Sequence, residues 1–326
     1  DDTLTRTASR ISNELHLQLA DRPTGKLLLL LDPVLRSIAE GDALAEGLGA
    51  LTSTPVKFVR YGIDPSHRPY LLELDTLTLA GSDYLARSVY EALTELQPAA
   101  LRTGAGRRIG GWLASKAPPA QVAHHLASVM ITHREDGSAF WLRLHDPAVL
   151  WWLWNLLEPA QRRILLGPIE TLWLLDPAGQ LVVLRGAPGQ EPVQPALFLP
   201  LGLSAQQWQD IENIESLNVA LRQWGGATAH PEQLDSLCTA VRNTLRRARA
   251  CGFSDRRDLA AYALCALRVH PAFDTHPHMR ERIEARGEDD YFTSLIEEFE
   301  DEDWQRIARE CEAGIIASLP PRHTVA

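Results

Sequence analysis

Strand-type and helix-type apolar patterns occupy different parts of this 326-residue chain, and that separation limits the folds open to it. Short apolar runs typical of strands alternate with helical patterns between residues 24 and 185. From residue 203 onward the apolar residues recur with the helical period, and we find no strand candidate there. The intervening residues 186–202 are dense in proline and glycine, which predicts a linker. We therefore expect an α+β protein, with a mixed α/β lobe containing antiparallel hairpins at 24–185, an all-helical lobe at 203–326 and an N-terminal extension at 1–23.

Turn residues bound the strand candidates of the first lobe. The run LLLLL is unbroken and apolar, as in a buried strand, and Asp32-Pro33 ends it. Ser82 is expected to cap one helix, and Pro118-Pro119 to open another. The predicted strands are 27–31, 56–62, 70–74 and 109–115.

The clearest local pattern is a hairpin in the middle of the first lobe. ASVMITH and SAFWLRLH flank the turn REDG, in which Asp136 and Gly137 supply the turn geometry that a tight hairpin requires. A second hairpin is expected in IETLWLLDPAGQLVVLRG.

The first hairpin runs directly into a possible active-site trio, Arg143, Asp146 and Pro147. An arginine and an aspartate near another carboxylate could form an acid–base site. The same residues fit a structural corner, in which Asp146 caps a helix, Pro147 occupies its first position and Arg143 closes on the cap carboxylate. We favour the corner because it explains the residues with fewer assumptions.

The helix after the corner carries three tryptophans. Most of its apolar side chains fall on one broad arc, which predicts a core face. Trp151 instead falls between Asn155 and Glu158 on the polar side. It is a candidate contact for a partner, since aromatic residues dominate interface energetics, and packing under the other lobe explains it equally well.

Charge is unevenly distributed. The chain has a net charge of −10, and residues 281–312 hold thirteen acidic residues against four arginines, a net charge of −9. An arginine-rich segment precedes this tract and suggests either a nucleic-acid patch or arginines that the adjacent acidic tract neutralises. We favour neutralisation, because an acidic chain also repels phosphate. Arg246, Arg249 and Arg256 are in addition candidate contacts for a protein partner, since arginine is enriched in interface energetics.

Metal, disulfide and membrane signals are weak. The four cysteines form no close pair, which favours a reducing compartment. No apolar run has the length of a membrane span, and the N-terminus lacks the layout of a secretory signal. The histidines lack metal-ligand spacing, so we expect no metal and no cofactor. They are His124, His125, His133 and His145 around the first hairpin, and His270, His276 and His278 farther on.

The order of these segments resembles the DUF4123 family over roughly residues 27 to 175. The resemblance rests on LLLLLDPVL, RPYLLEL, GGWLAS and EDGSAFWLRLHDPAVL, the last of which closes a hairpin on R-x-x-D-P-x-x-L. It implies a non-enzymatic adaptor chaperone of bacterial type VI secretion. Such a protein binds a toxic effector in the cytoplasm and promotes its loading onto a VgrG or PAAR spike protein. The expected partners are thus the cognate effector and the spike, with no nucleic acid and no membrane. A hydrolase or a nucleic-acid-binding protein with an unrecognised site is the alternative.

Overall fold

The computed structural model describes residues 2–20, 26–32, 51–58, 62–103, 106–186, 201–225, 231–287 and 290–314. The chain forms two compact units, Asp1–Trp208 and Gln209–Ala326. The first contains the sheet and the second is helical wherever it forms regular structure in the described residues, so the predicted α+β class is confirmed. Most of the linker expected at 186–202 lies outside the described residues.

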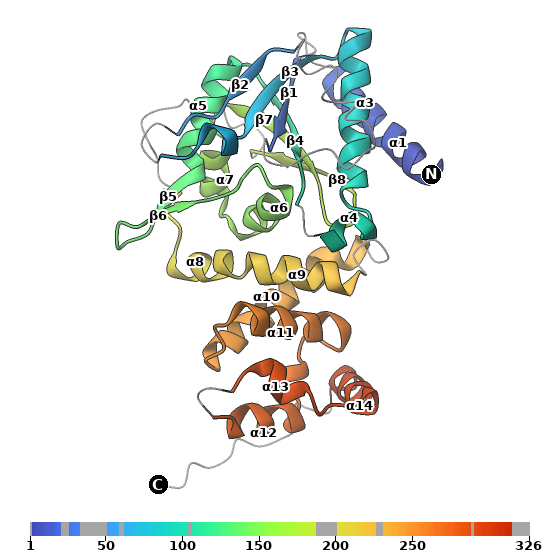
Figure 1. Ribbon diagram of the computed structural model, residues 1–326, viewed down its shortest axis with the longest axis vertical. Coiled ribbons are helices and arrows are strands. Elements are labelled where there is room, and N and C mark those ends of the chain that lie inside the picture. The colour runs from blue at the N-terminus through green and yellow to red at the C-terminus, as the bar shows by residue number, and fades with distance from the viewer. Residues whose placement is uncertain are drawn as a thin grey trace. The chain divides into compact units, whose positions relative to one another are not determined.

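A six-stranded antiparallel sheet forms the centre of the N-terminal unit (Figure 1). The leucine run forms its middle strand, where side chains on both faces are buried. In spatial order the strands are β2 (Ser53–Pro55), β3 (Tyr70–Asp75), β1 (Lys26–Leu31), β4 (Ile109–Ser115), β7 (Ile169–Leu175) and β8 (Leu181–Arg185).

The strand predicted at 56–62 is wrong in position. β2 ends at Pro55, and residues 56–58 form no ladder, while 59–61 lie outside the described residues. Val56 N nevertheless donates to Pro69 O at 2.8 Å, and Val56 and Phe58 are buried. The alternating apolar pattern therefore marked a buried segment that continues the β2–β3 pairing by one hydrogen bond and does not extend the ladder.

Helices lie on both faces of the sheet (Figure 1). On one face, α1 (Asp2–Ala20) and α3 (Leu79–Thr94) pack with the strands into a continuous apolar core. The segment expected to be an N-terminal extension thus contributes Ile11 and Leu15, both fully buried, to that core. The opposite face carries α5 (Pro119–Met130), α6 (Pro147–Leu156) and α7 (Pro159–Leu166), and α4 (Pro98–Thr103) follows α3.

Helix α3 starts earlier than the sequence predicts. Its N-cap is Thr78, whose Oγ1 accepts a hydrogen bond from Gly81 N at 3.1 Å. Ser82 lies inside the helix, and its Oγ is 3.0 Å from Nε2 of His16 on α1. The first turn carries the exposed Leu79, so it lacks the apolar period from which the helix was predicted.

Both predicted hairpins are present. β5 (Ile131–His133) and β6 (Ala139–Trp141) form a separate two-stranded sheet, with Gly137 at φ 81° and Asp136 Oδ1 accepting from Ser138 N at 2.8 Å. β7 and β8 form the other hairpin, whose turn includes Gly179 at φ 76°. A 3-10 turn, η1 (Pro65–His67), precedes β3.

The C-terminal unit is built around aromatic side chains. Phe253, Tyr262, Phe273 and Phe292 contact one another, with ring centroids 4.5 to 6.1 Å apart. Asn213 separates two consecutive helices, and Asp255 is the N-cap of the helix that begins at Arg256. The elements are α8 (Ala205–Glu212), which begins in the first unit, α9 (Ile214–Trp224), η2 (Pro231–Gln233), α10 (Leu234–Ala250), α11 (Arg256–Arg268), η3 (Phe273–Thr275), α12 (Pro277–Ala285), α13 (Phe292–Ile296) and α14 (Asp301–Glu312).

Among the described residues, no helix combines the length and the apolar character that crossing a bilayer requires.

Candidate functional site

The candidate site lies where the first hairpin turns into α6. Asp146 is the N-cap of α6, and its Oδ1 accepts a hydrogen bond from Ala148 N at 3.0 Å. Pro147 occupies the first helical position, where a missing N–H costs no hydrogen bond. Nη2 of Arg143 lies 3.9 Å from Asp146 Oδ2. The three residues therefore meet at one backbone corner.

A third carboxylate joins the corner from a distant part of the chain. Asp32 directly follows β1 and is 3% exposed. Its Oδ2 lies 3.5 Å from Nη2 of Arg143 and 3.3 Å from Nε2 of His145. From the sequence we expected Asp32 to end a strand and considered His145 only as a weak metal candidate. Their pairing spans more than a hundred residues, so no local pattern signals it.

Close backbone packing holds the corner against β4. An added Cβ at Gly110 would lie 2.5 Å from the carbonyl oxygen of His145. Glycine is therefore required here by the approach of another backbone segment.

Buried charges lie next to this corner at the start of β4. Glu95, at the end of α3, accepts hydrogen bonds from the main-chain N–H groups of Arg108 at 2.6 Å and Ile109 at 3.4 Å. Arg108 forms an ion pair with Glu91 at 3.3 Å. Arg107 donates to Leu175 O at 2.8 Å. These contacts link α3, β4 and the end of β7.

Burial dominates the electrostatics of this group. It raises the pKa of Glu95 to about 7, although the two main-chain donors and Arg107 oppose the rise. Burial also lowers the pKa of Arg107, against the attraction of Glu95, Asp146 and Asp176. Such shifts occur both at active sites and in structural networks.

Solvent exposure of the side chains distinguishes an acid–base site from a structural corner. Asp32 and His145 are 3% and 2% exposed, and half of the Arg143 side chain is exposed. Asp32 and His145 contact each other, and the Asp146 carboxylate accepts from a main-chain N–H, so the arrangement can fix the bend between β6 and α6. This geometry favours the structural corner.

Trp151 lies in a different environment from the one expected. Its side chain is 3% exposed, and its ring packs edge-to-face on Trp152 with centroids 4.8 Å apart. Helix α6 is short and buried on more than one side, so the polar neighbours Asn155 and Glu158 near its end do not mark a solvent face at Trp151.

The three candidate arginines of the C-terminal unit contact carboxylate or amide groups on α8, α9 or the residue between them. Arg246 pairs with Asp210, which is 1% exposed, through both carboxylate oxygens. Arg249 donates to Asn213 Oδ1 at 2.7 Å. Arg256 pairs with Glu215 at 2.7 Å, and both side chains are largely exposed. Carboxylates therefore neutralise Arg246 and Arg256, which disfavours a phosphate-binding patch.

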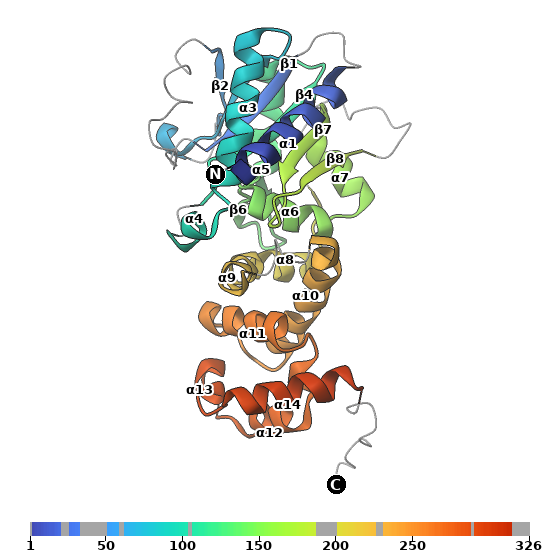
Figure 2. The same ribbon diagram turned by 90° about the vertical axis from the view of Figure 1, so that its right-hand side faces the viewer.

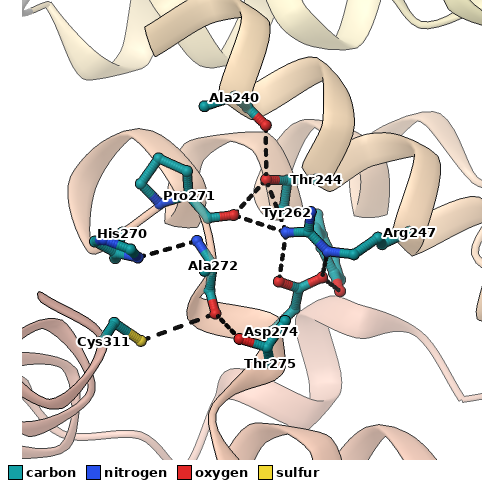
Figure 3. Close-up of polar contacts among 10 residues, drawn as sticks. All are labelled: Ala240, Thr244, Arg247, Tyr262, His270, Pro271, Ala272, Asp274, Thr275 and Cys311. Atoms are coloured by element: carbon teal, nitrogen blue, oxygen red, sulfur yellow. Dashed lines mark hydrogen bonds and ion pairs between the residues drawn. The ribbon is translucent and has the colours of Figure 1, made fainter. Parts of the chain in front are cut away.

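Another arginine of the same arginine-rich segment, which was not among the candidate contacts, anchors the core of this unit (Figure 3). Arg247 binds Asp274 through Nε at 2.8 Å and Nη2 at 2.7 Å, and also donates to Pro271 O. Tyr262 donates to the same carboxylate at 3.1 Å. Burial and this carboxylate raise the pKa of Tyr262. The contacts tie α10 and α11 to η3.

The histidines make separate contacts. His125 Nε2 lies 2.9 Å from Leu165 O, and burial lowers the pKa of this imidazole. His276 Nε2 lies 2.9 Å from Glu310 Oε2. In the part of the chain that the structure describes, no three or more histidine, cysteine or acidic side chains are arranged to hold a metal ion.

The hairpin and corner fall within a segment that is similar to a known family. Residues 66–164 match the DUF4123 family model, described as a domain of unknown function. The DUF4123 match extends from η1 to α7 and includes Arg143, Asp146 and Pro147. It supports the resemblance found in the sequence over that part of the chain. No curated protein matches the chain, and neither does any solved structure.

Proposed function

We propose that this chain is a non-enzymatic adaptor that binds a type VI secretion effector in the cytoplasm and promotes its loading onto a VgrG or PAAR spike. The DUF4123 match carries the proposal, since the resemblance implies this role. The match covers the hairpin and corner, the most specific part of the sequence pattern.

The geometry of the charged residues supports a protein that works through its surfaces. Asp32 and His145 are buried against each other, and Asp146 caps a helix. Arg246 and Arg256 are paired with carboxylates. These side chains are thus used to hold the backbone or to join helices.

Secretion of the product of the adjacent gene tests the proposal. Deletion of this chain should abolish delivery of that product while leaving spike secretion intact, and re-expression should restore delivery. Unchanged delivery in the deletion strain would refute the adaptor role.

A further inference from the structure

The two edges of the central sheet are built differently. β2 has three residues and ends in Pro55, which has no N–H to offer a new strand. β8, at the opposite margin, has five residues, LVVLR, with no proline, glycine or lysine (Figure 2). Short length and proline are common protections of edge strands, and β8 has neither.

The hairpin register shows which main-chain groups of β8 face outward. Asp176 N donates to Gln180 O at 3.0 Å, and antiparallel pairs alternate from that closing pair. Val182 and Leu184 therefore exchange hydrogen bonds with β7, while the N–H and C=O groups of Leu181, Val183 and Arg185 point away. Among the described residues, these three make no main-chain hydrogen bond outside the sheet ladder.

The side chains along this edge are apolar except at its end. Leu181 and Val182 are half-buried, and Val183 is 36% exposed. Arg185 is exposed and donates to the neutral Gln18 Oε1 at 3.1 Å. Within the described part of the chain Arg185 has no carboxylate partner.

We propose that β8 is a docking edge on which an extended, apolar segment of the effector adds as a further strand. This inference rests on the proposed function and locates the effector on the molecule. Main-chain hydrogen bonds would supply affinity, and an acidic residue of the segment would pair with Arg185. A second copy of this chain fits less well, because two-fold pairing centred on Val183 would place each Arg185 opposite Leu181.

Amide hydrogen exchange in the purified complex with the product of the adjacent gene tests the geometry residue by residue. In the free chain, the amides of Leu181, Val183 and Arg185 should exchange fast, and those of Val182 and Leu184 slowly. In the complex all five should exchange slowly. A complex in which the three outward amides still exchange fast would overturn the docking edge while leaving the adaptor role intact.

Variants at Val183 provide a matched test. Val183→Pro removes one outward N–H and no β7 ladder bond, and should weaken binding on the order of tenfold. Val183→Thr keeps the N–H and the shape, and should bind like the wild type. If the proline variant fails to fold, Val183→Lys, which protects the edge by charge, should weaken binding instead. Wild-type affinity in folded proline or lysine variants would overturn the inference.

Hydrogen exchange in the free chain distinguishes the other possible occupants of the β8 edge. Outward amides that become protected as the protein concentration rises would indicate a second copy on the edge. Outward amides protected at every concentration would indicate cover by the chain itself. Either result contradicts the proposal, and absence of any complex would refute both the adaptor role and this inference.

Discussion

Arg143 lies closer to Asp32, at 3.5 Å, than to Asp146, at 3.9 Å, although Asp146 is only three residues away. The corner is therefore tied to the end of β1 as well as to its own helix cap. A strand more than a hundred residues earlier thus helps to fix the direction in which α6 leaves the hairpin.

The Asp146 cap has a measurable energetic role. Asp146→Ala removes the acceptor of the Ala148 N–H and should lower the free energy of unfolding by about 1 kcal/mol. Asp146→Asn keeps an acceptor oxygen and should cost less. Chemical denaturation of the three proteins measures this order, and equal stability of the alanine variant would count against the cap.

Gly110 tests the close packing of the corner. Gly110→Ala brings a Cβ within 2.5 Å of the His145 carbonyl oxygen and should destabilise the N-terminal unit by about 2 to 3 kcal/mol. Gly186→Ala is the matched control, since no atom lies within 4 Å of its added Cβ. It should change stability by less than about 0.5 kcal/mol. Similar unfolding midpoints for both variants would argue against tight backbone contact at Gly110.

Glu95 should make stability depend on pH. Burial raises its pKa from the ordinary 4.5 to about 7, with Glu91, Arg107 and Arg108 as its charged neighbours. The folded state then binds more protons than the unfolded state between these values, so the unfolding free energy falls as pH rises through this window. The loss of unfolding free energy is on the order of 3 kcal/mol at most, and it should level off above the pKa that Glu95 has in the folded state.

Glu95→Gln isolates that effect. The variant keeps one acceptor oxygen, for the closer N–H of Arg108, and does not titrate. The difference in unfolding free energy between the wild type and the variant should decline from pH 5 to pH 8. Parallel curves over this range would show that Glu95 titrates normally.

Arg247 should contribute more to the stability of the C-terminal unit than the exposed Arg256. Arg247→Ala leaves the buried Asp274 without its cation and should cost about 2 to 3 kcal/mol, reduced because 39% of the arginine side chain is exposed. Arg256→Ala breaks an exposed pair and should cost about 0 to 1 kcal/mol. Hydrogen exchange within the C-terminal unit compares the two, and a larger loss at Arg256 would contradict the assignment.

The sequence correctly predicted the elements that depend on short stretches of neighbouring residues. The leucine run, both hairpins and the Asp146 cap follow from burial, turn chemistry and capping. Apolar periodicity misplaced the start of α3, because its first turn is exposed. It also predicted a strand after Pro55, where the buried Val56 adds one hydrogen bond to Pro69 O and the ladder ends.

Contacts between distant segments could not be predicted in this way. Asp32 with Arg143, and Arg247 with Asp274, depend on how elements pack in three dimensions. Trp151 was misplaced for a related reason, since a helical wheel assumes one solvent face. The edge position of β8 in the described sheet likewise follows from strand order and not from its five residues.

Co-expression of this chain with the product of the adjacent gene tests the proposed adaptor role most directly. Light scattering during size-exclusion chromatography should show a single complex of defined mass, with the adjacent gene's product soluble only when both chains are present. A product that is soluble alone and elutes apart from this chain would contradict the account.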